Sequence, residues 1–385
     1  SKNSNLPQKK PIIQTEEKII KKAENKKIVK EKIDIKKKEL ILKKTPKENQ
    51  KIVTFLLPKK KPITYKVQTK ELEKSTVLNP KDFERAKETI KFIKARKWNS
   101  ALISAKKVKN IEFRTLITWM HLKTTQNSAT FNDYKNFIEQ HEKYPRINRI
   151  KYLAETKIYL RNHSPTSIIN WFERHPPLGG IGKIKLAEAY LEQNKLEKVN
   201  KLIKEGWITA DIPKNDLGYY RAKVKKFLSA EDHIKRADYL AWERKYWDLK
   251  RMLKYLPSDE KALYNARQIL MSNSYGVDNA ILKVPNHLKT DTGLEYDRLR
   301  WRNRRGRLEG SLEILYKNSY RTEDQMVRPD KWWEQRKSVS RALIYKKRYK
   351  TAYKISSEHA LSAGSEFAEA EWLSGWIALT FLKSP

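Results

Sequence analysis

Hydrophobic positions recur at helical spacing from about residue 80 onward. After Pro80, the apolar residues Phe83, Ala86, Ile90 and Ile93 follow one another at intervals of three or four, which places them on one face of an α-helix. Later windows repeat this pattern, and no pair of alternating stretches flanks an Asn-Gly or Asp-Gly turn. The pattern therefore predicts an all-α chain.

A short phrase recurs along the helical region: a basic residue, a bulky apolar residue, and apolar or small residues three and six positions after the apolar one. Its copies begin at Lys97-Trp98, Lys195-Leu196, Lys245-Tyr246, Arg307-Leu308 and Arg348-Tyr349. Each copy follows an amphipathic stretch. In one of them Gln193-Asn194 comes first, and Asn tolerates the left-handed conformation that ends a helix. We expect helical hairpins stacked into an α-solenoid, or superhelix.

The hairpins are predicted to be irregular. Copies of the phrase lie about 40 to about 100 residues apart, whereas a tetratricopeptide repeat has a period of about 34 residues. The longest interval holds another candidate hairpin, with a first helix at residues 147–160. Its second helix is predicted at 166–172, opened by Ser164-Pro165, since Pro is favoured in the first helical turn.

Charge divides the chain into two regions. Residues 1–80 hold 23 Lys, no Arg and 9 acidic residues, a net charge of +14 that leaves +25 of the total of +39 for the rest. Such a segment buries too little apolar surface to offset its conformational entropy, so we predict a disordered linker or tail at 1–80. Residues 81–385 are predicted to form the superhelical domain. The leader is either a polybasic arm for an anionic surface or a solvated spacer, and we favour the spacer.

Composition excludes several classes of site. The chain has no cysteine, 11 glycines and seven histidines, which excludes disulfides and Cys-based zinc sites and leaves little for a histidine metal site. It also lacks the Gly-x-Ser-x-Gly and His-Glu-x-x-His motifs and a glycine-rich phosphate loop. From these missing residues and motifs we expect no metal or cofactor. No run of about 18 apolar residues occurs, so we expect no membrane span.

Carboxylates are numerous, but none is placed as catalysis of glycosidic cleavage requires. Glu366, Glu369 and Glu371 have helix-surface spacing, which favours a charged face or helix caps over an acid pair. Glu358-His359 has the residue types of an acid/base pair, although a His at a helix end is more often structural. Metal-ligand spacing is lacking around Asp211, Asp232-His233 and Asp238.

Aromatic and basic side chains each have two interpretations. The tryptophans could serve as stacking platforms for sugars or bases, or as large side chains in a helical core, and we favour the core. They are Trp242, Trp247, Trp301, Trp332, Trp333, Trp372 and Trp376. The densest basic cluster, a candidate contact for glycans or other anions, contains Arg300, Arg302, Arg304 and Arg305. Alternatively, these arginines cover apolar surface and pair with acids such as Glu295 and Asp297.

An ordered run of motifs over residues 83–385 resembles a known family. The strongest segments are Trp-Trp-x-x-Arg, at Trp332, Trp333 and Arg336, and Ala-Glu-Trp-Leu-x-Gly-Trp at residues 370–376. Upstream matches include residues 170–173, 264–267 and 294–298. In this order they are similar to the superhelical domain of soluble lytic murein transglycosylases, in the form carried by alphaproteobacteria.

The resemblance implies the non-catalytic region of a periplasmic enzyme that acts in cell-wall turnover. Such enzymes cleave the β-1,4 bond between N-acetylmuramic acid and N-acetylglucosamine, leaving 1,6-anhydro ends without a metal. The family carries its catalytic Glu in a Glu-Ser motif of a later, lysozyme-like domain, with a Gly-Leu-Met-Gln segment, and neither motif occurs here. We therefore expect this chain to be truncated before that domain, inactive alone, and partnered by peptidoglycan strands.

The family-signature residues are expected to be structural rather than catalytic. They are Trp332, Trp333, Arg336, Glu371, Trp372, Gly375 and Trp376. The lysine-rich leader departs from the family pattern, and the sequence favours no particular oligomeric state.

A non-enzymatic α-solenoid that binds RNA or protein is the alternative function. In that case the basic cluster at 300–307 and the leader contact phosphates. A repeat protein that reads bases one by one needs near-identical repeats with variable positions at fixed places, and the irregular repeats here disfavour it. A purely structural scaffold is a third possibility.

Overall fold

The computed structural model describes residues 74–272, 275–319 and 322–384. The chain divides into two units, Ser1–Leu72 and Glu73–Pro385, and the description below concerns the second. The prediction of a disordered lysine-rich segment at 1–80 falls almost wholly outside the described residues. Helix α2 (Pro80–Lys94) begins one residue before the predicted start of the helical domain.

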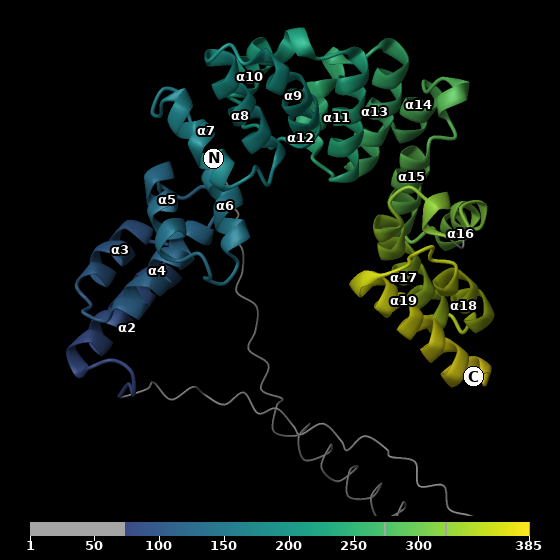
Figure 1. Cartoon of the computed structure of the whole chain (residues 1–385). Coiled ribbons are helices and arrows are strands. Elements are labelled where there is room, and N and C mark those ends of the chain that lie inside the picture. Colours follow the sequence, from purple (N-terminus) through teal and green to yellow (C-terminus); the bar gives the residue numbers. More distant parts are fainter. Residues whose placement is uncertain (1–73, 273–274, 320–321, 385) are drawn as a thin grey trace, which may run out of the picture. The chain divides into compact units, whose positions relative to one another are not determined.

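The described residues form helices, with no β-strand among them, which confirms the all-α class (Figure 1). After α2 come the α-helices α3 (Trp98–Lys106), α4 (Ile111–Lys123), α5 (Phe131–Gln140), α6 (Ile147–Glu155), α7 (Pro165–Arg174), α8 (Gly180–Glu192), α9 (Val199–Thr209), α10 (Leu217–Val224), α11 (Ala230–Trp242), α12 (Tyr246–Met252), α13 (Ser258–Met271), α14 (Val277–Leu282), α15 (Thr292–Arg304), α16 (Leu308–Lys317), α17 (Pro329–Tyr345), α18 (Tyr349–Ser357) and α19 (Gly364–Ile377). Short 3-10 helices are η1 (Leu196–Lys198), η2 (Lys225–Phe227), η3 (Leu253–Tyr255), η4 (Asn286–Leu288) and η5 (Glu323–Gln325), and η6 (Ala378–Leu382) is a π-helix.

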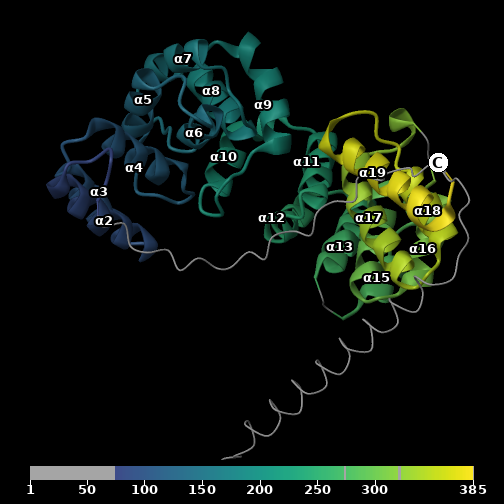
Figure 2. The same cartoon turned by 90° about the horizontal axis from the view of Figure 1, so that it is seen from below.

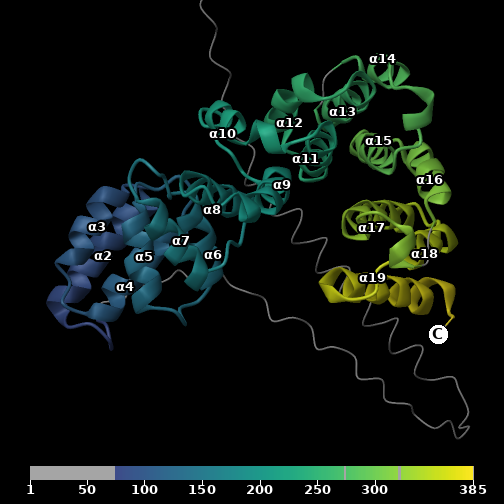
Figure 3. The ribbon, with the colours of Figure 1, turned by 45° about the horizontal axis from the view of Figure 1, so that its top comes forward.

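The helices pack mainly against their neighbours in the sequence. Hairpin partners such as α2 and α3, α8 and α9, and α15 and α16 contact each other, and successive hairpins meet through α9 and α11, then α13 and α15. Figure 3 shows the succession from α11 through α13 and α15 to α17. At the C-terminal end α17, α18 and α19 contact one another (Figure 2). Packing from neighbour to neighbour is the defining property of an α-solenoid, as predicted.

The same turn closes five hairpins. In the first, Arg96 has a left-handed φ of 58°, and the next residue, Lys97, donates its backbone N–H to the carbonyl of Phe92 at 2.9 Å. This bond spans five residues backward and defines a Schellman motif. The equivalent bond and a positive φ recur at Asn194-Lys195, Arg244-Lys245, Gly306-Arg307 and Lys347-Arg348. In every case the basic residue of the recurring phrase directly precedes the next helix.

The recurring phrase is therefore confirmed as a mark of the hairpin turn and of the contact after it. Both later positions are buried in four copies, at Ala101 and Ser104, Leu249 and Met252, Ser311 and Ile314, and Ala352 and Ile355. In the copy at Leu196, Val199 is buried and Leu202 is partly buried against the core. The first turn of each second helix thus docks on the preceding helix.

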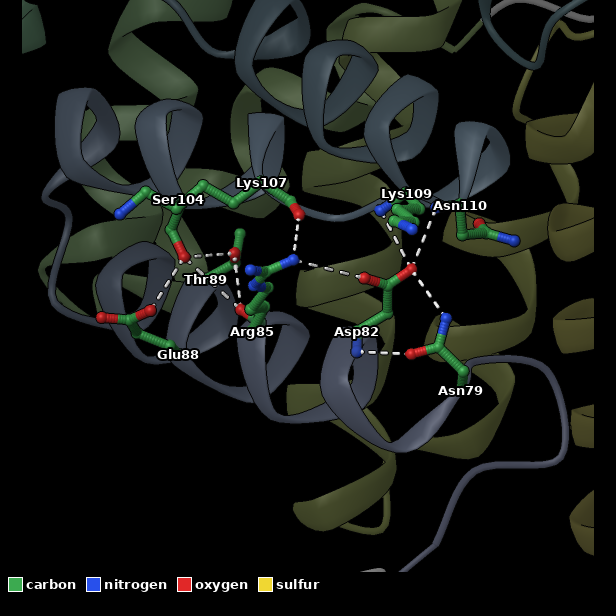
Figure 4. Close-up of polar contacts among 9 residues, drawn as sticks. All are labelled: Asn79, Asp82, Arg85, Glu88, Thr89, Ser104, Lys107, Lys109 and Asn110. Atoms are coloured by element: carbon green, nitrogen blue, oxygen red, sulfur yellow. Dashed lines mark hydrogen bonds and ion pairs between the residues drawn. The ribbon is translucent and has the colours of Figure 1, made fainter.

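The buried face of α2 differs from the predicted one. Asp82, Ala86 and Thr89 are buried, whereas three of the four predicted residues are only half-buried: Phe83, Ile90 and Ile93. Thr89 donates its hydroxyl to Ser104 of α3 at 3.0 Å (Figure 4). Because Asp82 and Thr89 have hydrogen-bond partners in the interior, the buried face of α2 is rotated away from the predicted apolar face.

Asp82 ties the start of α2 to the start of α4. Its Oδ2 accepts hydrogen bonds from the backbone N–H groups of Lys109 (2.9 Å) and Asn110 (3.2 Å) and from the side-chain amide of Asn79 (3.2 Å) (Figure 4). Burial pushes the pKa of Asp82 upward, but these hydrogen bonds and the nearby Arg85 hold it below its ordinary value. Asp82 is therefore a structural carboxylate.

The additional hairpin predicted in the longest interval is present in part. Helix α7 begins at Pro165, and Ser164 caps it by accepting the backbone N–H of Ser167 at 3.2 Å. Helix α6 ends at Glu155 rather than at the predicted residue 160. The Glu155 carboxylate instead accepts the backbone N–H groups of Leu178 (2.5 Å) and Gly179 (3.0 Å) at the start of α8.

Cationic side chains cap the carboxyl ends of several helices. Each donates hydrogen bonds to backbone carbonyls near the end of another helix: Lys185 to residues after α6, Arg236 to α9 and Ala210, Arg304 to α13, and Arg336 to α18 and to Asn318 after α16. These carbonyls carry the partial negative charge of the helix dipole. Part of the chain's positive charge is therefore used to hold helices together.

Two hydrophobic clusters fill the interior between helices. The first extends from Leu122 to Leu294, and the second from Trp242 to Ile377. Helices α11 and α15 contribute residues to both clusters. The candidate site lies at these two helices.

Candidate functional site

A groove with a volume of about 570 Å³ lies where α9, α11, α13 and α15 approach the segment that precedes α17. Its apolar walls include Ile208, Ile234 and Val327, and its aromatic walls include Tyr239, Trp242 and Tyr264. Its ionisable groups are Lys235, Asp238, Asp291 and Arg328. Aromatic walls with a few polar groups are typical of ligand sites of this size.

A fully buried guanidinium lies beneath the groove. Arg267 on α13 donates from Nη1 to Asp238 Oδ1 of α11 at 2.7 Å and from Nε to Asp297 Oδ2 of α15 at 2.9 Å. Asp291 Oδ1 lies 3.9 Å from the same Nη1. Arg267 therefore joins α13 to α11 through Asp238, and to α15 through Asp297 and the preceding Asp291.

The guanidinium is also enclosed by the lining of the groove. It lies over the rings of Trp242 (5.2 Å to the centroid) and Tyr264 (5.6 Å). A Cβ added to Gly293 would overlap the guanidinium carbon, so a larger residue at this position would displace the Arg267 side chain. Arg267 Nη2 has no hydrogen-bond partner among the described residues although it is buried. The cluster thus keeps one unused donor next to the groove.

Charges inside the cluster oppose the effect of burial. Burial pushes the pKa of Arg267 down, but Asp297, Asp238 and Asp291 together raise it above its ordinary value. For Asp297, burial raises the pKa to about 6, although Arg267 acts in the other direction. The guanidinium is therefore charged at neutral pH, and Asp297 is mainly ionised.

The cations that line the groove are already paired with acids of their own. Arg328 has its Nη2 3.2 Å from Glu243 Oε1 and 3.0 Å from Asp330 Oδ2. Lys235 is paired with Glu231 at 3.5 Å, one turn back on α11. By contrast, Asp238 and Asp291 share a single guanidinium with Asp297. The uncompensated charge of the groove is therefore negative, although the chain as a whole carries +39.

The four arginines of the predicted basic cluster differ in their contacts, and their proposed contact with glycans or other anions stays a prediction. Arg302 donates to the Gly310 carbonyl (2.5 Å) and pairs with Glu313 (2.9 Å). Arg304 donates to the carbonyls of Leu270 (2.6 Å) and Met271 (3.2 Å). These two arginines are held by their own fold.

The other arginines of the cluster have different surroundings. Arg305 lies over the ring of Trp301 at 4.6 Å, and Arg300 is half-buried on α15. The predicted pairing of the cluster with Glu295 and Asp297 is wrong. Glu295 is paired with Lys317, and Asp297 with Arg267.

Three of the family-signature residues form a buried unit. Trp332, Trp333 and Arg336 are each 1% exposed or less. Trp333 Nε1 donates to Glu369 Oε2 of α19 at 3.1 Å. Arg336 donates to the carbonyls of Asn318 (2.5 Å) and Ile355 (3.1 Å), and burial lowers its pKa to about 10. These side chains join α16, α17, α18 and α19.

The remaining signature residues lie on the outer face of α19. Trp372 is 62% exposed and Trp376 is 38% exposed, with parallel rings 6.0 Å apart, and Glu371 and Gly375 are also exposed. The expectation that these two tryptophans form part of a core is wrong, as it is for Trp247, which is also exposed. Helix α19 is apolar on both sides and buries the opposite face, which contains Ala370, Leu373, Ser374 and Ile377.

The predicted acidic candidates are engaged in structural contacts. Glu369 pairs with Lys337 at 2.7 Å in addition to Trp333. His359 contacts Glu371 at 2.8 Å, whereas Glu358 accepts a hydrogen bond from Ser319. Glu366 accepts from Ser365 at 2.7 Å.

The acids considered for a metal site also have structural partners. Asp232 caps the start of α11 by accepting the Ser229 N–H at 2.9 Å, and Asp211 pairs with Lys245. Within the described ranges no group of three or more His, Asp or Glu side chains is arranged to hold a metal ion. In the same ranges no helix combines the length and apolar character needed to cross a membrane.

Sequence reasoning missed Arg267 and Asp297 as a pair. They are 30 residues apart and belong to neighbouring helices of different hairpins. Each was part of a matched motif, at 264–267 and 294–298, but neither had been assigned to a site. The signal that could have found them is a cation and an acid on the apolar faces of two helices, α13 and α15, that contact each other.

No known protein family, curated protein or solved structure matches this chain.

Proposed function

We propose that this chain is the superhelical, non-catalytic region of a peptidoglycan lytic transglycosylase. Its role would be to hold glycan-peptide strands in the periplasm for an enzyme that cuts the β-1,4 bond to give 1,6-anhydro ends. The supporting observation is the ordered run of family-like motifs, whose strongest segment supplies Trp332, Trp333 and Arg336 to the contacts between hairpins. Side chains that hold helices together in this way are typical of a scaffold rather than of an active site.

The electrostatics of the chain supports this proposal further. Residues 81–385 retain a net charge of +25 after the lysine-rich leader is set aside. A cationic surface raises the local concentration of anionic polymers and speeds their association. The catalytic step belongs, on this proposal, to a lysozyme-like domain encoded further along the gene.

Co-sedimentation tests the binding function directly. The purified chain is mixed with murein sacculi or with RNA at increasing salt, and we expect it to pellet with sacculi in preference to RNA. The variants Arg300→Ala and Arg305→Ala should reduce retention, and Lys91→Ala on the distant exposed surface of α2 serves as a charge-matched control. Strong retention of RNA with no binding to sacculi would reject the proposal.

The enzymatic part needs a separate test. Digestion of sacculi by the product of the complete gene should release anhydro-muropeptides, while the present chain alone should release none. A gene that continues without any Glu-Ser motif, and a product that releases no anhydro ends, would contradict it.

An RNA- or protein-binding solenoid is the second candidate. It is favoured by one observation, the exposed ring of Trp247, 63% accessible, with Lys250 at 5.5 Å from its centroid. An accessible aromatic next to a cation is a common arrangement for stacking on single-stranded bases. The RNA arm of the co-sedimentation experiment decides between the two.

A further inference from the structure

A cavity beside α5, separate from the groove, is lined by basic and polar side chains. Its volume is about 340 Å³. One wall is the start of α5, residues 129–132, and the other is the chain between α6 and α7, which supplies Lys157, Tyr159, Arg161, Asn162 and His163. None of the described residues that line it is acidic. The lining therefore has a positive charge.

Local contacts hold the two walls together. The backbone N–H of His163 donates to the Tyr159 carbonyl at 3.1 Å and closes a turn. The ring of His163 meets the buried ring of Phe131 edge-on, with 5.0 Å between the centroids. Lys157 Nζ donates to the Asn127 carbonyl at 2.7 Å, which ties this segment to the chain before α5. The cavity is thus enclosed by segments that contact each other.

The two cations of the lining have no acidic partner. Arg161 lies over the ring of Tyr159 at 4.7 Å and makes no hydrogen bond or ion pair with the described residues. Burial lowers the pKa of Lys157, and no carboxylate among the described residues raises it again. Burial also lowers the pKa of His163, so this ring adds no charge near neutral pH. Two positive charges are therefore left without compensation in the lining.

Two acids close to the cavity are engaged outside it. Asp133 accepts the backbone N–H and the hydroxyl of Thr130, both at 2.7 Å, in the capping box of α5. Asp216 precedes α10, and burial together with this carboxylate raises the pKa of Tyr159. Neither carboxylate is part of the lining.

Several hydrogen-bond donors of the lining lack an acceptor. Phe131 and Asn132 are the first two residues of α5, and their backbone N–H groups donate to no described residue. Such N–H groups carry the positive end of the helix dipole. The side-chain amides of Asn132 and Asn162 have no hydrogen-bond partner among the described residues either. An anion with several oxygen atoms would satisfy these donors together with Arg161 and Lys157.

Charge distinguishes between the possible anions. A phosphate monoester carries a charge of about −1.5 to −2 at neutral pH and three strong acceptor oxygens. It balances both cations, whereas a carboxylate or a phosphodiester has a single negative charge and would leave one cation uncompensated. Arginine and lysine both suit a phosphate group, the former through two parallel hydrogen bonds.

We propose that this cavity binds the phosphate group of a phosphate monoester, held by Arg161, Lys157 and the backbone N–H groups at the start of α5. A helix N-terminus next to cationic side chains is a common arrangement for phosphate. This inference goes beyond the proposed function and does not rest on it.

Three small anions test the ligand class. Binding of methyl phosphate, dimethyl phosphate and acetate to the purified chain is measured by calorimetry slightly above neutral pH, at a physiological salt concentration that screens attraction to the basic surface. We expect methyl phosphate to bind saturably and to shift the amide NMR signals of Phe131 and Asn132. The two singly charged anions should bind about tenfold more weakly or less. Equal affinity of either one, or no saturable binding of methyl phosphate, would overturn the proposal.

An added carboxylate tests the location. Asn132 is exposed at the second position of α5, where an acidic residue stabilises a helix, so Asn132→Asp should preserve the fold. It should abolish binding of methyl phosphate, because it places a negative charge in the lining. Asn148→Asp, at the second position of α6 and also exposed, is the matched control and should bind as the parent chain does.

Removal of the guanidinium tests the cation. Arg161→Gln should weaken methyl phosphate binding about tenfold or more, since it removes charge-assisted hydrogen bonds. Arg149→Gln is the control, because Arg149 is likewise exposed and lies over a tyrosine ring, that of Tyr152, at 5.3 Å. Unchanged affinity in Arg161→Gln and Asn132→Asp, or an equal loss in the controls, would show that methyl phosphate does not occupy this cavity.

Discussion

Arg267 Nε lies 2.9 Å from Asp297 Oδ2, and neither side chain is accessible to solvent beyond 3%. The pair joins α13 to α15 inside the interface between two hairpins. A buried ion pair is sensitive to the loss of one partner, because the remaining charge is left without compensation in a medium that solvates it poorly.

Arg267→Met should therefore destabilise the chain by about 3–5 kcal/mol. Denaturant unfolding followed by circular dichroism measures the change. The double variant Arg267→Met with Asp297→Leu should recover much of the loss, since it replaces the pair with apolar groups. Asp238→Asn is the control, because Asp238 is half-exposed and its loss should have a smaller effect. A single variant as stable as the parent would contradict this role of Arg267.

The hairpin turns predict a stabilising substitution. Arg96 and Lys347 hold left-handed φ values of 58° and 60°, and both side chains are exposed and make no hydrogen bond or ion pair with the described residues. Glycine adopts this conformation without steric strain, so Arg96→Gly and Lys347→Gly should each stabilise the chain by about 0.5–1 kcal/mol. Thermal unfolding measures the effect.

The neighbouring position supplies the matched control for this turn. Lys346 has an ordinary φ of −83°, so Lys346→Gly should give no gain. Gly306→Ala, at the one turn that already has glycine, should lose stability because its φ is 67°. Stabilisation by Lys346→Gly equal to that by Lys347→Gly would show that strain is not the cause.

The raised pKa of Glu155 predicts that the free energy of unfolding depends on pH. Burial raises the pKa of this carboxyl from 4.5 to about 7, although hydrogen bonds from the Leu178, Gly179 and Gly182 backbones lower it. The folded chain therefore holds the proton more tightly than the unfolded chain. The stability that this proton contributes is fully present below pH 4.5 and is lost as the pH rises through about 7, up to about 3 kcal/mol.

Glu155→Gln removes that titration. The stability of the parent chain relative to this variant should fall between pH 4.5 and 7, as measured by denaturant unfolding over this range. A constant difference across the range would mean that Glu155 keeps an ordinary pKa in the folded chain.

Two helical glycines predict opposite responses to alanine. A Cβ at Gly182 of α8 would lie 2.5 Å from the Glu155 carboxyl, whereas a Cβ at Gly218 of α10 would meet nothing within 4 Å. Gly182→Ala should destabilise by about 1–3 kcal/mol through overpacking. Gly218→Ala should stabilise by about 0.5–1 kcal/mol, since alanine is the better helix former. Equal effects in thermal unfolding would contradict the close approach of Glu155 to α8.

Hydrophobic spacing and turn signals were sufficient to predict the five hairpin turns that carry the recurring phrase. The phrase at Lys97-Trp98 and its copies depends on short-range geometry, in which a basic residue follows the left-handed position and small or apolar residues dock one and two turns later. Ser164-Pro165 likewise marks α7 through a local cap. Local rules of this kind are readable from sequence because both partners lie within a few residues.

Burial was less predictable where polar partners come from a distance. The Asp82 carboxylate is buried because it meets the backbone of Lys109 and Asn110, and nothing in the spacing of α2 indicates this. On α19 the apolar residues extend around the helix, so the pattern did not tell which face meets α17 and α18, and Trp372 and Trp376 lie outside. The groove depends on Arg267 and Asp297, which become neighbours only through the order of hairpins.

The shared turn also explains how the hairpins can vary so much in spacing. At Arg96-Lys97 and at its four counterparts the junction is closed by main-chain hydrogen bonds within six residues. A turn closed in this way does not depend on the length of the two helices that it joins. Insertions or deletions in the loops between hairpins would therefore leave the five turns intact.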